Sequence, residues 1–341
     1  MNLTIYEIAE KAGVSIATVS RALNAETRSK VSPETLKRVD AVIAKHQYRP
    51  NLAAKGLTQQ VYRTIGVMIP HGQGTFYNDY YVRILGGISD ALLDTDYRFK
   101  MLMLKCHEPW DRYNFRSAES VDGVIVTHWH AFFSDKKVFK QLGIPCVILG
   151  DPEKGLHAHI VSGDQAMGGR LAAEYFYQRG HRRMAVITGS PCSMDSAERL
   201  EGFQKFLKEK KITVDADLVV CGDFQEEKGK AAAVALLKTG KKFSALFCLN
   251  DAMAFGALAA FREQGIECPA DISVIGFDDE ARARESRPAL TTVRVPLNEI
   301  ARAAALILTA HLKAGKHERP FEGQVTLLPV TLVERASVAK K

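Results

Sequence analysis

The chain has 341 residues, of which 46% are hydrophobic and 25% are charged, a composition typical of a globular protein with two or three domains. It contains no run of about 18 apolar residues and no basic segment followed by an apolar stretch at its start. Neither a transmembrane helix nor a secretory signal is therefore expected. The six cysteines are scattered without a CxxC pair, which favours a reducing, cytoplasmic location.

The net charge of +7 is unevenly distributed along the chain. Residues 1–60 contain 9 lysines and arginines but only 5 acidic residues, a net charge of +4 in less than a fifth of the chain. A basic excess in one small module indicates a polyanionic partner.

The N-terminal part of the chain predicts three short helices. Thr4 and Glu7 have the spacing of a capping box, so the first helix should begin just after Thr4. Gly13 suits the left-handed backbone position that ends this helix. Ser15 can cap a second helix after a tight turn, and Ser32, followed by a proline, can cap a third.

The second of these helices has two different faces. Val19 and Leu23 lie four residues apart and form the face expected to be buried. The opposite face carries Ile16, Ala17, Thr18, Ser20 and Arg21. Such a face suits the DNA major groove, where arginine can pair with guanine and apolar groups can touch a thymine methyl. The alternative from spacing alone is a small helical bundle without a role in DNA binding.

Longer strings carry a more specific signal than the helix spacing. "TIYEIAEKAGVSIATVSRALN" and "VSPETLKRVDAVIAKHQYRPNLAAKGL" resemble the lactose-repressor/galactose-repressor family of bacterial transcription regulators. The resemblance continues through "GHRRMAVITG", "NDAMAFGAL" and "SVIGFDD". It implies a DNA-binding regulator, expected to be a repressor, that acts as a homodimer on a pseudo-palindromic operator. It also implies control by a small-molecule effector, expected to be a sugar or a sugar derivative.

The resemblance also assigns DNA contacts. Base contacts are expected from Ile16, Ala17, Thr18 and Arg21, phosphate contacts from Ser15, Ser20 and Asn24, and a further DNA contact from Thr4. In "RPNLAAKGLTQQ", Leu57 is expected to enter the minor groove as a wedge that kinks the DNA. Asn51 and Lys55 should contact the groove or the DNA backbone. The alternative for Leu57 is packing on the first strand of the core.

From residue 62 onwards, short apolar runs alternate with longer amphipathic ones, which predicts parallel sheets covered by helices. Strands are predicted at 64–70, 99–105, 121–127, 145–151, 183–189, 217–223, 244–250 and 272–279. Helices are predicted at 80–94, 166–181, 196–211, 228–240 and 252–265. Because these strands are too many for one compact sheet, we expect two α/β lobes with a cleft between them.

The expected fold is therefore α/β, with an N-terminal helix-turn-helix headpiece at 1–48, a hinge helix and linker at 49–61 and a core at 62–341. The resemblance implies a core like the periplasmic sugar-binding proteins, which the chain crosses three times between the lobes. We expect the first lobe at about 62–161 and 292–320. The second lobe should comprise about 162–291 and 321–336.

Ligands of such folds bind at the carboxyl ends of the strands. The residues that the motifs and the resemblance place there are Tyr80, Tyr81, Asp164, Arg199, Phe224, Asn250 and Asp278. Arg, Asp and Asn side chains offer paired hydrogen bonds, and aromatic faces cover the apolar faces of rings, a combination that suits a sugar. The alternatives are a helix-end salt bridge for Arg199 and a loop cap for Asp278.

One departure from the family pattern and two subgroup features affect these expectations. The segment "HEPWDRYNFRSAES" is short and contains Pro109 where relatives have a fuller helix, which leaves the local fold at 107–120 open. The loop "SPCSMD" lacks the cation of the purine-responsive subgroup, which favours a sugar over a purine. The closing "VERASVAKK" has no apolar heptads, so a tetramerising tail is not expected.

Other classes of function have weaker support in the sequence. The pairs His128/His130 and His157/His159 could suggest a metal, but a site needs three or four ligands, and His128 or Trp129 is better explained as lining the cleft. No nucleotide-binding or nucleophile motif is present, so neither an enzyme nor a cofactor is expected. A transport protein with the same core would need a signal peptide and would lack the headpiece.

Overall fold

The structure is a computed structural model, and its contacts divide the chain into two units, Met1–Tyr62 and Arg63–Lys341. It describes residues 3–24, 27–48, 61–71, 79–105, 115, 119–127, 138–150, 156–317, 319 and 321–341. Leu57, Lys55 and Asn51 of the predicted hinge, and the segment around Pro109, lie outside the described residues. No helix among the described ranges is long and apolar enough to span a membrane.

The first unit contains the predicted helices. Its elements are α1 (Ile5–Ala12), α2 (Ile16–Leu23), the short 3-10 helix η1 (Arg28–Lys30) and α3 (Pro33–His46). The predicted capping box is confirmed, because the Thr4 hydroxyl accepts from the Glu7 amide while the Glu7 carboxylate accepts from the Thr4 amide at 2.7 Å. Gly13 has the left-handed φ of 62°, as predicted.

The three helices of this unit enclose a small apolar core. Its buried members are Ile8, Ala9, Ala12, Val19, Ala22 and Val39. Leu23, predicted to be buried with Val19, is only partly buried and packs against this core. Arg28 ties the end of α2 to α3, since it donates to the Ala22 carbonyl and pairs with Asp40. The outward face of α2 is thereby left for other contacts.

The first lobe of the second unit is built on a six-stranded sheet in the order β11-β5-β4-β3-β1-β2. Its strands are β1 (Thr64–Pro70), β2 (Arg98–Leu104), β3 (Gly123–Val126), β4 (Cys146–Leu149), β5 (His159–Gly163) and β11 (Val325–Leu328). All neighbouring strands of this sheet pair in parallel, as predicted. Helices α5 (Asp79–Leu92) and α13 (Leu297–Lys313) pack against each other on one face, and α7 (Val138–Gln141) contributes Phe139 to the core of the other face.

The second lobe is built on a six-stranded sheet in the order β12-β10-β9-β8-β6-β7. Its strands are β6 (Met184–Thr188), β7 (Val219–Cys221), β8 (Ala245–Cys248), β9 (Ser273–Phe277), β10 (Thr291–Arg294) and β12 (Thr331–Val333). Strand β12 alone runs antiparallel, paired with β10. Because the other strands are parallel, their carboxyl ends meet at one edge of the sheet.

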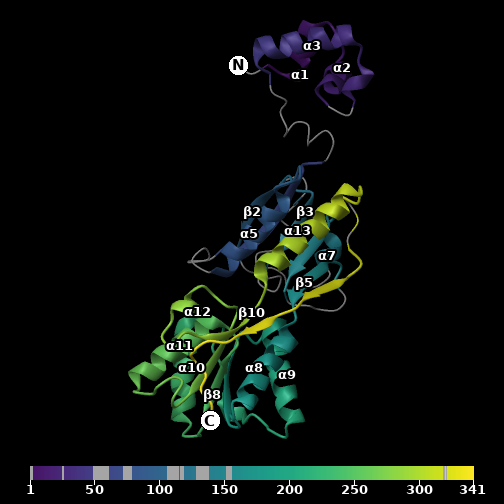
Figure 1. Ribbon diagram of the computed structural model, residues 1–341. Coiled ribbons are helices and arrows are strands. Elements are labelled where there is room, and N and C mark those ends of the chain that lie inside the picture. Colours follow the sequence, from purple (N-terminus) through teal and green to yellow (C-terminus); the bar gives the residue numbers. More distant parts are fainter. Residues whose placement is uncertain are drawn as a thin grey trace. The chain divides into compact units, whose positions relative to one another are not determined.

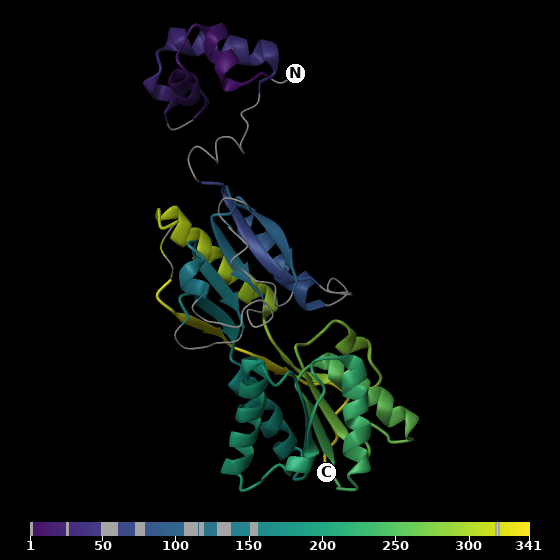
Figure 2. The same ribbon diagram turned by 180° about the vertical axis from the view of Figure 1, so that it is seen from behind.

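Two helix pairs cover the second sheet (Figures 1 and 2). The helices are α8 (Gln165–Gln178), α9 (Met194–Glu209), α10 (Glu226–Lys238) and α11 (Asp251–Glu263), with the short η4 (Ala216–Leu218) and α12 (Arg282–Glu285) in the connections. Helices α8 and α9 pack together on one face and α10 and α11 on the other. Phe203 of α9 stacks on Phe247 of β8 with ring centroids 4.8 Å apart, which anchors the first pair to the sheet.

The expected lobe boundaries need two corrections. Strand β10 pairs with β9 of the second sheet, so the chain returns to the first lobe at Val295 and not at about 292. Strand β11 pairs with β5 of the first sheet, so residues 325–328 belong to the first lobe and not to the second. The apolar string "LLPVTLV" is thus divided between two sheets at Pro329 and Val330.

The three crossing segments meet at Gly163. A Cβ placed on Gly163 would lie 3.1 Å from a methyl of Val295 and 3.1 Å from a methyl of Val330. Each of these residues belongs to a different crossing between the lobes. A side chain at this position would therefore crowd the two valines of the other crossings.

Candidate functional site

The outward face of α2 is the first candidate surface. Ile16, Ala17, Ser20 and Arg21 are exposed, with Ile16 at 40%, although isoleucine is usually buried in a small domain. Thr18 is partly exposed, and its hydroxyl lies 2.9 Å from the Ser15 hydroxyl. This helix face can therefore contact base edges in a DNA major groove. Its guanidinium can donate to guanine, its hydroxyl groups can hydrogen-bond to bases, and its apolar side chains can touch a thymine methyl.

The remaining DNA-contact candidates lie at the ends of these helices. Ser15 is the N-cap of α2 and accepts from the Thr18 amide, so its hydroxyl stands where the helix presents unpaired N–H groups. Such a position suits a phosphate. Thr4 occupies the corresponding position of α1 and is exposed, and Asn24 is the C-cap of α2.

The second candidate site surrounds Arg199, whose side chain is only 8% exposed. Its guanidinium donates to the Gln165 side-chain oxygen at 2.8 Å and to the Leu249 carbonyl. It lies 3.4 Å from the Asp278 carboxylate and stacks 3.9 Å from the centre of the Phe277 ring. Arg199 is therefore fixed at the carboxyl edge of the second sheet, with its charge partly balanced.

Glycines in both α8 and α9 let the two helices cross closely and bring Arg199 to this position. A Cβ on Gly169 would lie 1.9 Å from the Arg199 carbonyl oxygen, and one on Gly202 would lie 1.9 Å from the Ala166 carbonyl oxygen. A Cβ on Gly168 would meet the Phe277 ring at 2.5 Å. The close crossing of α8 and α9 thus places the guanidinium over Phe277.

Asp278 begins a loop that is held from several directions. Its φ of 106° is rare for a non-glycine residue, and its amide donates to the Val293 carbonyl at 2.8 Å. Buried Asp251 braces the loop, because its carboxylate accepts from the Thr292 hydroxyl at 2.6 Å and from the Glu280 amide at 2.8 Å. The backbone conformation of Asp278 is therefore imposed by its surroundings.

Two carboxyl groups of this loop are shifted towards neutrality. Burial raises the pKa of Asp278 to about 6, against the opposing effect of the Arg199 and Arg83 guanidinium groups. Burial, reinforced by the charges of Asp278 and Asp79, raises the pKa of Glu280 to about 7. Perturbed carboxyl groups beside a buried arginine are typical of a binding site.

Phe224 and Asn250 complete the edge on the side of β7 and β8. The Phe224 ring lies against Gly189, where a Cβ would meet it at 2.0 Å, and its centre is 6.0 Å from the Arg199 guanidinium carbon. The Asn250 amide donates to the Phe224 carbonyl at 3.1 Å, and its oxygen caps α11 by accepting from Met253. Asn250 therefore positions the aromatic residue, which has a φ of 59°.

The first lobe supplies aromatic and charged groups at its own carboxyl edge. Tyr80 and Tyr81 lie edge to face with centroids 5.3 Å apart, and the Tyr80 hydroxyl reaches the Thr127 carbonyl after β3. Two approaches connect the lobes. Arg83 of α5 donates to the Asp278 carbonyl of the second lobe and to the Val295 carbonyl of the crossing segment after β10. Asp195 at the start of α9 lies 3.0 Å from a Cβ placed on Gly150 after β4.

The structure brings most of the predicted cleft residues together. Arg199, Asp278, Phe224 and Asn250 converge at one sheet edge, and Tyr80 and Tyr81 lie at the edge of the other lobe. Asp164 is the N-cap of α8, accepting from Met167 at 2.9 Å, and stands beside the Gln165 that holds Arg199. The sequence reasoning missed Gln165, Phe277 and Arg83. The only signal for Gln165 was its place directly after the predicted cleft acid Asp164.

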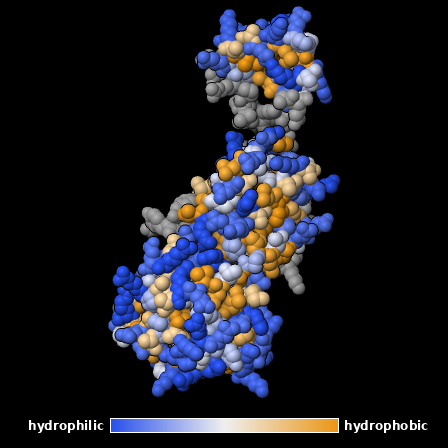
Figure 3. Space-filling view, viewed as in Figure 1, coloured by the Kyte–Doolittle hydropathy of each residue, from blue (hydrophilic) through white to orange (hydrophobic). Residues whose placement is uncertain are grey.

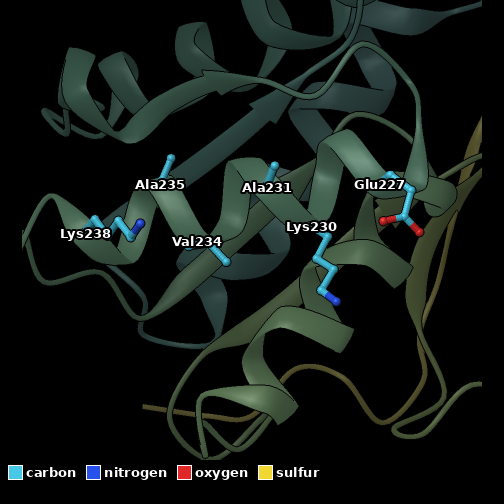
Figure 4. A pocket seen from close by; sticks show the side chains of 6 residues that line it. All are labelled: Glu227, Lys230, Ala231, Val234, Ala235 and Lys238. Atoms are coloured by element: carbon cyan, nitrogen blue, oxygen red, sulfur yellow. The ribbon is translucent and has the colours of Figure 1, made fainter.

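Two other features lie outside this site. His159 is buried and bonded to the Thr326 hydroxyl at 2.9 Å, and no cluster of three or more metal-ligating side chains occurs in the described ranges. His128, Trp129 and His130 are not among the described residues. A groove of about 510 Å³ follows α10 and is lined by apolar and charged side chains in equal number, Ala231, Val234 and Ala235 with Glu227, Lys230 and Lys238 (Figure 4).

An exposed helix-turn-helix face in one unit and a polar edge facing a second lobe in the other define a ligand-responsive DNA-binding regulator. The comparisons with known proteins agree. Residues 4–51 match the family described as "Bacterial regulatory proteins, lacI family", and residues 173–338 match "Periplasmic binding protein-like domain". The chain belongs to the LacI family and is a DNA-binding transcriptional regulator.

Several known proteins match this chain over nearly their whole length. The transcriptional repressor PurR of Proteus mirabilis is 31% identical, over 98% of this chain and 97% of its own. A lac repressor dimer bound to operator and the anti-inducer ONPF is 25% identical with a TM-score of 0.79, covering 99% of this chain and 100% of that one. A CelR–cellobiose complex is 27% identical with a TM-score of 0.73, covering 98% and 100%.

The raised pKa of Glu280 predicts a pH-dependent stability. The folded state holds the Glu280 proton more tightly than the unfolded chain, so this carboxyl lowers stability as pH rises from about 4.5 to about 7. Glu280→Gln should therefore raise the free energy of unfolding at pH 8, by at most roughly 3 kcal/mol, and change it little at pH 4.5.

Chemical denaturation of the core at pH 4.5, 6 and 8 measures this difference. Glu299→Gln removes an exposed carboxyl of α13 and controls for the loss of one negative charge. A stabilisation by Glu280→Gln that is equal at all three pH values would contradict the assignment.

Proposed function

We propose that the protein is a cytoplasmic repressor whose operator affinity is controlled by a sugar or sugar derivative bound between the lobes. The convergence of Arg199, Asp278 and Phe224 at the cleft edge carries this proposal. The buried guanidinium and the carboxylate can share hydrogen bonds with ring hydroxyls, and Phe224 can cover an apolar sugar face. The CelR relative, which was solved with cellobiose, supports a carbohydrate as the effector.

DNA recognition is proposed to run through the exposed face of α2. Arg21, Thr18, Ile16 and Ala17 would reach base edges, while Ser15, Ser20 and Asn24 at and near its ends contact phosphates. Thr4 adds a contact from α1. Leu57, Asn51 and Lys55 keep their proposed hinge contacts on the strength of the sequence resemblance, and Leu57 is proposed as the minor-groove wedge.

Operator binding tests this assignment directly. A preferred operator is selected from random duplexes, and affinity is measured by fluorescence anisotropy at a fixed salt concentration. Arg21→Ala should cost about 1–3 kcal/mol on the selected operator and relax the preference at one base pair of each half-site. The control is Lys37→Ala, which removes an exposed cation of α3. Unaltered affinity and preference in Arg21→Ala would remove α2 from base recognition.

We further propose a homodimer that places two headpieces on a pseudo-palindromic operator. The lac repressor relative was solved as a dimer on its operator. In this chain the edge strand β2 exposes Met101 at 47%, on the sheet face that α5 covers. Val82 of α5 is 54% exposed, and Leu93, directly after α5, is 75% exposed. They lie about three helical turns apart and so on the same side of the helix. An apolar face beside an unpaired strand edge suits a second copy of the chain.

A second exposed apolar surface, on α13, is the alternative dimer contact and supplies a control variant. Apolar side chains also gather over the first lobe in Figure 3, and α13 exposes Leu306 at 44%. Met101→Glu should shift the protein to monomers in sedimentation velocity and lower operator affinity at least tenfold, since dimer and half-site pairing are linked. Leu306→Glu should leave both unchanged. The reverse pattern would place the dimer contact on α13.

A further inference from the structure

Arg83 links the first lobe to the second lobe and to the crossing segment after β10 through a pair of hydrogen bonds. It lies on α5 of the first lobe, and its guanidinium donates to the Asp278 carbonyl at 3.0 Å and to the Val295 carbonyl at 3.1 Å. Asp79, one turn earlier on the same helix, lies 3.8 Å from it. The Arg83 side chain is 20% exposed, so both bonds are made in a largely dry environment.

The two acceptors stand at the ends of neighbouring strands. Asp278 follows β9 and Val295 follows β10, and these strands pair in parallel in the second sheet. Their carbonyls therefore lie side by side at the carboxyl edge of the sheet. The planar fork of an arginine can bond both carbonyls at once, which an ammonium group cannot do with the same geometry.

Asp278 carries both the bond to Arg83 and the contact with the candidate binding site. Its carbonyl accepts from Arg83 of the first lobe, and its carboxylate lies 3.4 Å from Arg199 of the second. Its φ of 106° orients these two groups and persists only while the surroundings hold it. Any separation of the lobes that breaks the Arg83 bonds therefore removes the first lobe's restraint on the backbone that aims this carboxylate, and leaves only the restraints from the second lobe.

We propose that Arg83 is a positioning residue of the effector site that acts from the opposite lobe. By capping β9 and β10 it holds the Asp278 carboxylate against Arg199, and so it makes effector affinity depend on the approach of the lobes. The proposal rests on the proposed function of the cleft. Arg83 itself is not assigned a contact with the effector.

Amide hydrogen exchange of the full-length protein without ligand tests the positioning role. The amides of Asp278, which donates to Val293, and of Leu297, which donates to Val295, report on the two capped segments. Arg83→Met should speed exchange at both by on the order of tenfold, because local opening is governed by the contacts that close it. Exchange in α10 and α11 should stay as in the wild type. Unchanged exchange at both amides would overturn the proposal.

Two further variants keep this test decisive. Arg302→Met removes an exposed arginine of α13 in the same lobe and should change neither amide. Arg83→Met could speed exchange throughout the first lobe, which would indicate a general loss of stability. In that case Arg83→Lys is tested instead, because lysine keeps the positive charge but lacks the planar guanidinium that bonds both carbonyls. Arg83→Lys should speed exchange at one or both of the same amides, and wild-type exchange at both would overturn the proposal.

Sugar binding then separates this inference from the proposed function. The probe is whichever of cellobiose, galactose and ribose gives the largest thermal shift with the wild type. Arg83→Met should weaken its binding on the order of tenfold, and should weaken it no further in an Asp278→Asn background. Additive losses would overturn a role exerted through Asp278. If none of the three sugars binds, the carbohydrate proposal fails while hydrogen exchange still decides the role of Arg83.

Discussion

The buried charge of Arg199 is the constraint on which the cleft edge depends. A guanidinium that is 8% exposed must find acceptors, because an unpaired buried cation is costly. It finds them in Gln165, Leu249 and Asp278, which follow three different strands. The two glycines of α8, Gly168 and Gly169, leave room for α9 to cross closely enough to deliver this side chain. One buried charge thus fixes a helix crossing, three strand ends and the orientation of the candidate effector ligands.

The same requirement connects the binding site to the movement of the lobes. Asp278 is only 20% exposed, has a raised pKa and adopts a left-handed backbone, so its position is maintained by neighbours and not by local preference. Some of those neighbours belong to the second lobe, and Arg83 belongs to the first. A ligand that satisfies Arg199 and Asp278 together would therefore favour one arrangement of the lobes, which is the differential interaction that allostery requires.

The sequence predicted what is local and missed what depends on tertiary contacts. The capping box at Thr4 and Glu7 and the outward face of α2 follow from spacing within a few residues, and the α/β alternation follows from apolar periodicity. Strand β5 was not predicted, because His159 and Ser162 interrupt its apolar run. The crossings at Val295 and Pro329 were misplaced because short apolar strings can pair with either sheet. Arg83 sits within an ordinary amphipathic helix, and only the folded core reveals its acceptors.

The central claim is that a ligand at Arg199 and Asp278 sets operator affinity from within the core. Its most direct test is operator binding by anisotropy, with and without each of a panel of neutral sugars that includes cellobiose and ribose, for the wild type and Asp278→Asn. We predict that at least one sugar changes wild-type operator affinity about 5- to 150-fold. Asp278→Asn should bind the operator as the wild type does without sugar and should not respond to that sugar. An equal response in the variant, or no response of the wild type to any sugar, would contradict the account.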